Sequence, residues 1–291
     1  MADKLGLSAK GLGRVTDLFL ATWMGRAGLA IIAFFLLLAV YATLFVDYDP
    51  TIQDGTIKLQ DFNWEHPFGT DHLGRDILDR ILVGTKPSLI VGFSAMIISM
   101  GIGTLVGLAS GYWGGWRDEV IMRINDMFLS VPWLILMIVL ASVIETRSLN
   151  SIIIVIGITG WSTVSRIVRS QVLTLKERQF IERARAIGSS DWHIIRRHIF
   201  PNVVPLVFAN AILTVAICIL SEATLSFLKL GPQDTETWGK ILSDAYDQGV
   251  AIQGPYAFII MPGLFIVFVV LGFTFIGYAM DEVLNPKLRK R

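Results

Sequence analysis

Six long stretches of this chain contain no Asp, Glu, Lys or Arg. They cover residues 27–46, 87–116, 127–144, 148–165, 199–221 and 248–280. A bilayer has a hydrocarbon core of about 30 Å, and a helix rising about 1.5 Å per residue needs about 20 residues to cross it. The stretches therefore predict an all-α integral membrane protein with six transmembrane helices.

The composition excludes several other classes of protein. Hydrophobic residues make up 53% of the 291 residues and charged residues only 17%, whereas soluble proteins average about 45–50% and about 25%. A soluble enzyme core and a disordered chain are therefore excluded. The single cysteine, Cys218, can form no disulfide within the chain. The net charge of +1 argues against nucleic acid as a partner.

The basic residues predict how the spans are oriented. With both termini in the cytoplasm, eighteen Lys and Arg residues lie inside and seven lie outside, which is the usual positive-inside bias. The chain then divides into a cytoplasmic tail at 1–26, a six-span domain at 27–280 and a basic cytoplasmic tail at 281–291. Within the six-span domain we expect external loops at 47–86 and 229–254 and a cytoplasmic segment at 166–202.

The cytoplasmic segment 166–202 is amphipathic at helical spacing. Its apolar side has Phe180, Ile181, Ala184 and Ile187, and its polar side has Arg178, Glu182 and Arg185. Thr174 and Glu177 suit a capping box at the start of this helix, and Gly188 suits the left-handed position after its end. The sequence therefore predicts a short helix that stops at a glycine turn.

A second short helix is expected at 192–200. Ser189, Ser190 or Asp191 can cap its start, and Pro201 is expected to stop it. On physical grounds alone, the two helices form either a knob that docks onto a partner or an amphipathic surface that rests on lipid headgroups.

Two motifs are similar to those of a known family. The order Glu182-Arg183-Ala184, Gly188, Phe200-Pro201 resembles the EAA motif of binding-protein-dependent ABC importer permeases; Arg183, His198 and Phe200 depart from its usual Ala, Ile and Leu. Residues 66–76 resemble the hallmark of the oligopeptide and dipeptide permease C subfamily. The signature residues there are His66, Pro67, Gly69, Asp71, Gly74, Arg75 and Asp76.

Three further stretches are similar to that subfamily. Residues 222–228, then Gly231 and Trp238-Gly239, resemble its fifth span and outer loop, and residues 285–289 resemble its carboxy-terminal ending. Lys229 stands where a glycine is usual. The resemblance extends over almost the entire chain from about residue 25 onward.

The resemblance implies a type I ABC importer permease fold and an ATP-driven importer of di- or oligopeptides or related small solutes. It implies four kinds of contact: a homologous permease subunit, two ABC ATPase subunits, an external solute-binding protein and the lipid bilayer. Coupling to the ATPase is expected at Glu182, Ala184, Arg185, Gly188 and Pro201.

The residues themselves also argue that ATP is hydrolysed elsewhere. A phosphate-binding loop needs Gly-x-x-x-x-Gly-Lys-Ser/Thr, but Gly239-Lys240 is followed by Ile241 and has Asp234 at the first glycine position. The chain is therefore expected to be a subunit without catalytic residues or cofactors. A metal site is not expected either, because the four histidines lack the spacing that places two ligands on one helix face. They are His66, His72, His193 and His198.

Three features allow a structural and a functional interpretation. Gly103, Gly107 and Gly111 recur every four residues, which favours close helix packing within the permease pair over a flexible gate. Residues 66–76 either orient an amphipathic piece at 77–83 or contact the binding protein. Glu222, inside an apolar span, either forms a hydrogen bond or ion pair at an external gate or contacts substrate on its path.

Two other functions remain open at this point: a secondary carrier and a membrane scaffold that transports nothing. A carrier would be expected to show paired repeats and broken helices with charges at the membrane midplane, which the sequence lacks. A scaffold would have no need of a docking knob. The sequence does not identify the substrate, the host or the partner subunits.

Overall fold

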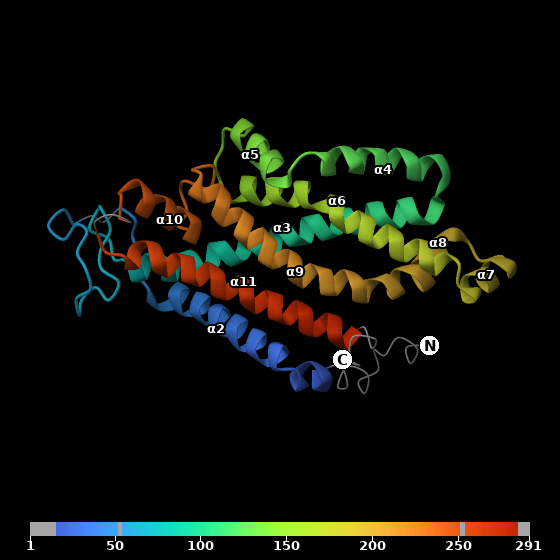
Figure 1. Ribbon diagram of the computed structural model, residues 1–291, viewed down its shortest axis with the longest axis horizontal. Coiled ribbons are helices and arrows are strands. Elements are labelled where there is room, and N and C mark those ends of the chain that lie inside the picture. Colours follow the sequence, from blue (N-terminus) through green and yellow to red (C-terminus); the bar gives the residue numbers. More distant parts are fainter. Residues whose placement is uncertain (1–15, 52–53, 251–253, 285–291) are drawn as a thin grey trace.

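The protein is described here from a computed structural model that covers residues 16–51, 54–250 and 254–284. In these ranges the regular structure is helical apart from one isolated bridge between Thr70 and Asp76. The helices, drawn in Figure 1, are α2 (Trp23–Phe45), α3 (Ile77–Trp113), α4 (Gly115–Ser130), α5 (Trp133–Val143), α6 (Leu149–Lys176), α7 (Gln179–Ala186), α8 (Asp191–Ile194), α9 (Phe200–Phe227), α10 (Trp238–Asp247) and α11 (Ala257–Leu284). A π-helical segment, Ile195–Ile199, joins α8 to α9.

The predicted all-α membrane fold is confirmed. Five helices among the described residues are long and apolar enough to cross a bilayer: α2, α3, α6, α9 in continuation of α8, and α11. Four of the six predicted stretches fall on α2, α6, α9 and α11. The second stretch falls on α3, which begins ten residues earlier and absorbs the piece predicted at 77–83.

The stretch predicted as a third span, 127–144, is not one straight helix. The chain bends by 87° between α4 and α5, with Val131 extended and Pro132 at the start of α5. Proline lacks an N–H and disfavours helical backbone in the residue before it. The described residues therefore have five unbroken spans, and six if the bent pair α4–α5 is counted as one span.

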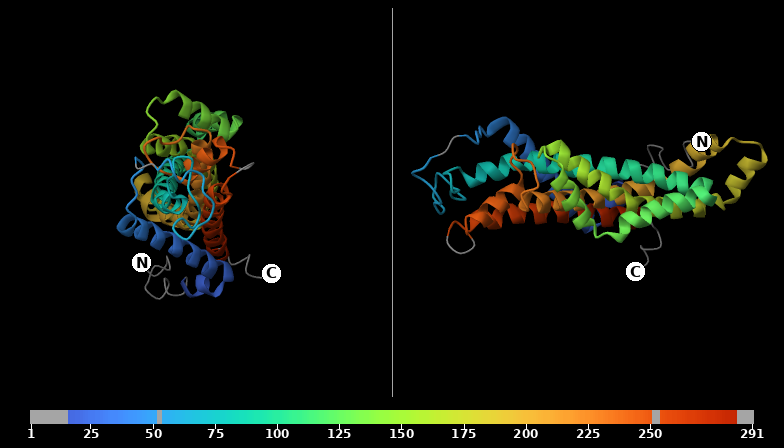
Figure 2. Two further views of the ribbon diagram at one scale, coloured as in Figure 1. Left: turned by 90° about the vertical axis from the view of Figure 1, so that its left-hand side faces the viewer. Right: turned by 90° about the horizontal axis from the view of Figure 1, so that it is seen from above.

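The helices form an elongated bundle with α3 and α6 at its centre (Figure 1). On one flank α2 packs against α11, and on the other the broken pair α4–α5 lies over α6. At one end of the bundle lie residues 54–76 and α10, which we call the loop end. At the other end α7 and α8 project beyond the spans, which we call the knob end (Figure 2).

Glycines determine how closely the two central helices approach. A Cβ atom placed on Gly103, Gly107 or Gly111 of α3 would come within 2.5–2.8 Å of the Cβ atoms of Val164, Val168 and Val172 on α6. Any larger residue would push the helices apart. The structure thus favours the close-packing interpretation and places the contact inside this chain, between α3 and α6.

Candidate functional sites at the two ends of the bundle

The knob consists of α7, the turn at Gly188, α8 and the π-helical segment. Ile181 and Ala184 are buried against the bundle, whereas Glu182 and Arg185 are exposed. Gly188 has a φ of +81°, so the predicted left-handed turn is confirmed. Ser190 caps α8 by accepting a hydrogen bond from the His193 amide at 3.3 Å, as predicted.

Two details of the knob differ from the sequence prediction. Thr174 donates its hydroxyl to the Ser170 carbonyl instead of forming a capping box with Glu177, because α6 continues as far as Lys176. Pro201 does not stop a helix, since α9 passes through it. In the π-helical segment before Pro201, the Phe200 amide donates to the Ile195 carbonyl five residues back. Pro201 lies in the first turn of α9, where a missing N–H is tolerated.

The apolar side of α7 is only partly buried. Ile187 is 83% exposed, and Trp192 on α8 is 69% exposed. Single exposed apolar residues are common, but here one lies on each side of the turn at Gly188. A large apolar side chain gains free energy when a partner removes it from water. The knob therefore has the character of a docking surface.

Tyr112, at the end of α3, fastens the knob to the bundle. Its hydroxyl donates to Asp191 Oδ1 at 2.5 Å, and its carbonyl accepts from Lys176 Nζ at 2.7 Å. The Arg185 guanidinium lies 5.7 Å from the centre of the Tyr112 ring, within the range of a cation–π interaction. The hydroxyl of Tyr112 therefore ties the knob to α3, and its carbonyl ties that end of α3 to Lys176 of α6.

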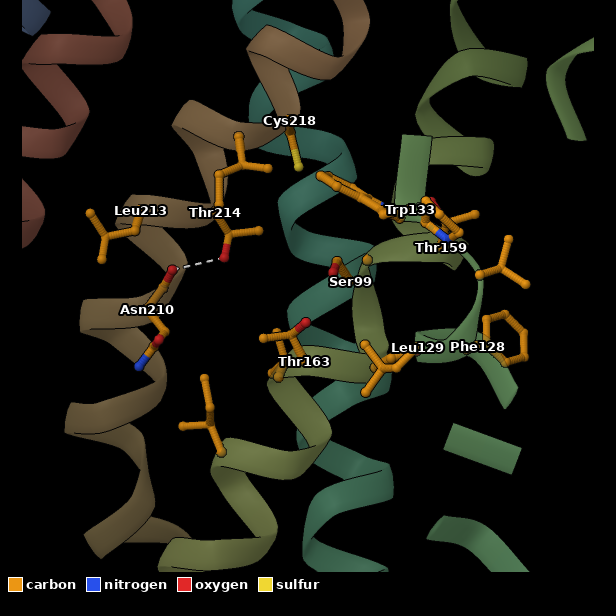
Figure 3. Close-up of a pocket in the computed structure, with 17 residues that line it drawn as sticks. Ser99, Phe128, Leu129, Trp133, Thr159, Thr163, Asn210, Leu213, Thr214 and Cys218 are labelled. Atoms are coloured by element: carbon orange, nitrogen blue, oxygen red, sulfur yellow. Dashed lines mark hydrogen bonds between the residues drawn. The ribbon is translucent and has the colours of Figure 1, made fainter. Parts of the chain in front are cut away.

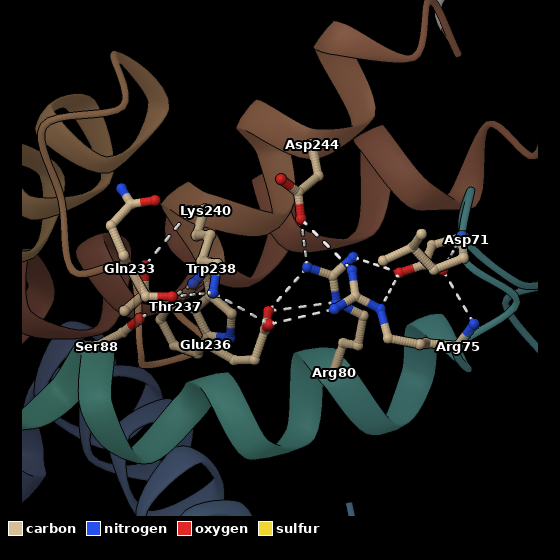
Figure 4. Close-up of polar contacts among 11 residues, drawn as sticks. Asp71, Arg75, Arg80, Ser88, Gln233, Glu236, Thr237, Trp238, Lys240 and Asp244 are labelled. Atoms are coloured by element: carbon tan, nitrogen blue, oxygen red, sulfur yellow. Dashed lines mark hydrogen bonds and ion pairs between the residues drawn. The ribbon is translucent and has the colours of Figure 1, made fainter. Parts of the chain in front are cut away.

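The loop end contains a cluster of charged side chains that we call the ionic cluster (Figure 4). It consists of Asp71, Arg75, Arg80, Glu236 and Asp244. The fully buried Arg80 donates to Asp71 Oδ2 at 2.7 Å, Glu236 Oε2 at 2.8 Å and Asp244 Oδ2 at 2.6 Å. Arg75 Nε donates to the same Asp71 oxygen at 2.7 Å. The cluster thereby joins the signature turn to α3 and α10.

The arginines keep the carboxylates of the ionic cluster ionised. Burial raises the pKa of Asp71, but the charges of Arg80 and Arg75 and the backbone amide of Arg75 outweigh it, so the pKa lies below its usual value. Burial likewise raises the pKa of Glu236, and the charges of Arg80, Lys240 and Arg75 lower it further than burial raises it. Both carboxylates are therefore ionised near neutral pH.

The signature residues 66–76 fold into a fixed turn. Pro67 lies in a turn closed by the Gly69 amide on the His66 carbonyl at 2.9 Å, and His66 Nδ1 is 2.7 Å from Asp76 Oδ2. Gly69 and Gly74 have φ values of +77° and +81°, where glycine is favoured. Asp76 then caps α3 by accepting from the Asp79 amide at 3.1 Å. This geometry favours the interpretation that residues 66–76 orient the start of α3.

Glu222 is fully buried in α9. Ser226 Oγ donates to its Oε1 at 2.6 Å, and Oε2 has no hydrogen-bond partner among the described residues. No ion pair is formed by Glu222 in the part of the chain that the structure describes. Gly239 of α10 packs so closely that a Cβ there would lie 2.6 Å from the Ala223 Cα and 2.8 Å from the Ser226 Cβ. Glu222 thus lies where α9 meets α10.

Several residues of these sites were not predicted from the sequence. Arg80 is separated from Glu236 and Asp244 by more than 150 residues, so no local spacing connects them. Locally, Arg80 follows Asp79 directly, and nothing in that pairing indicates a distant partner. Tyr112 gave no signal. The predicted carboxy-terminal ending at 285–289 lies outside the described residues, as do most of the tail at 1–26 and residues 285–291 of the tail at 281–291.

Comparison with known proteins identifies the family. Residues 103–290 match the family described as binding-protein-dependent transport system inner membrane component. The chain belongs to this family. The bundle is accordingly that of a multi-pass inner-membrane protein, as the apolar helices predict.

Individual relatives match over nearly the whole length. The chain is 36% identical to the oligopeptide transport system permease protein of Bacillus subtilis (strain 168), covering 99% of this chain and 94% of that protein. It is 39% identical to the dipeptide transport system permease protein of Alkalihalophilus pseudofirmus, covering 90% of this chain and 85% of that one. Among solved structures, an inward facing conformation of the MetNI methionine ABC transporter matches with a TM-score of 0.58 and 19% identity, over 71% of this chain and 97% of that chain. This likeness shows the fold of an ABC importer permease.

Proposed function

We propose that this chain is the permease subunit of an ATP-driven importer of peptides or related small solutes. Its relatives at 36% and 39% identity are permease proteins of oligopeptide and dipeptide transport systems, which supports the class of solute. The observation that carries the proposal is the knob, which projects from the bundle yet is fastened through Tyr112 to α3, which in turn is bonded to Lys176 of α6. A fastened knob can pass a force from a partner into the spans.

In this proposal the knob docks onto one of two ABC ATPase subunits. Ile187 and Trp192 supply exposed apolar surface, and Glu182 and Arg185 supply charge beside it. Gly188 and Ala184 set the shape, since the first permits the turn and the second is small enough to pack against the bundle. Pro201 lies in the first turn of α9, where the knob ends. ATP hydrolysis belongs to the ATPase subunits and not to this chain.

The loop end faces outward in this proposal, because the excess of basic residues lies toward the knob. The ionic cluster holds residues 66–76 and α10 together as one surface. A solute-binding protein delivers the solute to that surface. A homologous permease subunit completes the translocation pathway. Glu222 accepts a hydrogen bond from Ser226 beside α10 and stabilises the external gate.

Copurification and uptake test the proposal together. The chain, expressed with its native partner subunits, should copurify with an ATPase, and proteoliposomes that contain the complex should take up triglycine only with ATP and the binding protein. A secondary carrier would take up solute without an ATPase, and a scaffold would not take it up at all. Either result would contradict the proposed function.

A further inference from the structure

Two neighbouring aromatic side chains at the loop end, which we call the aromatic pair, are exposed to water. Trp64 is 92% exposed and Phe62 is 65% exposed, and their ring centres lie 5.9 Å apart in an edge-to-face arrangement. Trp64 is the most exposed of the large apolar side chains among the described residues. Aromatic side chains gain free energy when a partner removes them from water. The aromatic pair is therefore a candidate contact for a partner.

Hydrogen bonds hold the segment that carries the aromatic pair in one conformation. Asn63, between the two aromatic residues, accepts through Oδ1 from the amides of Glu65 at 2.9 Å and His66 at 2.7 Å. Its own amide donates to the His66 carbonyl at 3.1 Å. The buried Thr70 ties this segment to the signature turn, since its amide donates to the Gln60 carbonyl at 3.0 Å. Side chains held in place before binding lose less conformational entropy when they bind.

The aromatic pair lies too far from the bilayer to anchor in lipid headgroups. Residues 54–76, which include the pair, lie beyond the start of α3 at the loop end (Figure 2). The charge-free stretch of α3 begins at residue 87, ten residues after Ile77, and this is about 15 Å along a helix. The headgroup layer outside the hydrocarbon core is only about 5–8 Å deep. The partner that covers the pair therefore lies outside the membrane.

The aromatic pair is also too far from the interior of the bundle to contact a solute there. A cavity of about 390 Å³ lies beside the break between α4 and α5, and its lining includes Trp133, Thr163 and Thr214 (Figure 3). Thr163 is 14 residues from the start of α6, which is the end of that helix nearer the loop end. This is about 21 Å along the helix. The pair therefore acts at the outer surface and not on a solute in this cavity.

The charges beside the aromatic pair indicate what kind of partner covers it. Asp61 directly precedes Phe62, and Glu65 directly follows Trp64. Both carboxylates are exposed, and neither forms an ion pair within the part of the chain that the structure describes. An acidic surface opposite them would be repelled, whereas lysines or arginines would be attracted. The partner surface that fits is therefore an apolar recess with a basic rim.

We propose that the aromatic pair is the anchor on which the solute-binding protein docks, with both rings in an apolar recess of that protein and its basic residues beside Asp61 and Glu65. The inference rests on the proposed function, which brings a binding protein to the loop end. It assigns most of the docking free energy to Phe62 and Trp64, whereas residues 66–76 hold the anchor in place. A few aromatic residues commonly supply most of the binding free energy of an interface.

The test uses the complete importer in nanodiscs with its native binding protein. It measures the concentration of binding protein that gives half-maximal stimulation of ATP hydrolysis. Trp64→Ala and Phe62→Ala should each raise this concentration about tenfold to thirtyfold, as for truncation of an anchoring aromatic residue. Basal hydrolysis and the rate at saturating binding protein should stay at the wild-type values. Trp116→Ala, which removes a side chain 71% exposed on α4, is the matched control and should change nothing.

The basic rim is tested separately through salt. With the wild-type chain, added salt should raise the half-maximal concentration, because it screens exposed charges. Asp61→Asn combined with Glu65→Gln should raise it about twofold to fivefold at low salt and remove most of the salt dependence. Glu119→Gln, which neutralises an exposed carboxylate on α4, should keep the wild-type salt dependence.

Three results would overturn the inference. They are a half-maximal concentration in both aromatic variants equal to that of the wild type, an unchanged salt dependence in the charge variant, and failure of Trp64→Ala to assemble with the homologous permease subunit. The last result would assign the pair to a contact between the two permeases. Uptake of triglycine by the wild-type complex is measured in parallel. ATP-dependent uptake that requires the binding protein, with unaltered aromatic variants, refutes this docking site alone, whereas absence of ATP-dependent uptake refutes the proposed function.

Discussion

Tyr112→Phe tests whether the knob moves together with α3. The change removes the hydroxyl that donates to Asp191 at 2.5 Å. It retains the ring beside Arg185 and the backbone carbonyl that accepts from Lys176. The variant therefore loses one contact between α3 and α8 and leaves the others in place.

The size of the effect follows from the kind of bond. Hydrogen bonds to charged groups contribute about 1.5–3 kcal/mol, and because Asp191 is exposed we take the lower figure, about 1.5 kcal/mol. This corresponds to roughly a tenfold shift between the fastened and the loosened knob. We expect ATP hydrolysis to continue while peptide uptake falls, so that more ATP is spent per peptide. Basal ATPase activity and assembly should stay near the wild-type values.

The assay is the ratio of phosphate released to peptide taken up in proteoliposomes, measured for Tyr112→Phe, Asp191→Asn and the double variant. The two changes should be non-additive, because each breaks the same bond. Tyr278→Phe, an exposed tyrosine on α11, is the control. An unchanged ratio, or effects of the two single variants that simply add, would refute the role assigned to Tyr112.

Four further perturbations test the two ends of the bundle. Gly188→Val should leave the chain in the membrane but abolish transport and weaken ATPase association, because a β-branched residue at a φ of +81° costs about 1–3 kcal/mol. Gly101→Val is the control, since Gly101 has open space around it. Normal transport by Gly188→Val would contradict the role assigned to the turn. Arg80→Met leaves three carboxylates without their shared partner and should lower stability by about 3–5 kcal/mol in thermal unfolding, far more than loss of the exposed Lys229–Asp247 pair through Lys229→Met. The pKa values of Asp71 and Glu236 in the folded protein lie below their ordinary values of 3.8 and 4.5. The two carboxylates therefore contribute fully to stability above the ordinary values, and this contribution is lost as the pH falls through the folded-state pKa values. When the pH is lowered below about 4, the melting temperature should fall, and it should fall less in Arg80→Met. Glu222→Gln keeps the oxygen that accepts from Ser226 and should transport nearly normally, whereas Glu222→Leu should fail; equal failure of both folded variants would show that the charge itself is needed.

The sequence by itself determined the membrane fold and most of the spans. Absence of charge over about 20 residues admits few structures other than a helix in lipid, because every backbone N–H and C=O must then be bonded within the segment. The glycine turn was readable for a similar reason, since a left-handed backbone strongly favours one residue type at Gly188. Such local constraints act through the residue itself or through its near neighbours.

The tertiary structure decided the sites. Arg80 contacts Glu236 and Asp244 only because α3 and the segment that carries α10 meet at the loop end. Tyr112 contacts Asp191 only because α6 returns the chain to the end of α3. The break at Pro132 illustrates the difference, since Pro201 and Pro205 are accommodated within the continuous α9 whereas Pro132 separates α4 from α5. Whether a proline bends a helix depends on the bonding pattern and packing around it, and partners distant in sequence are not encoded in any local pattern.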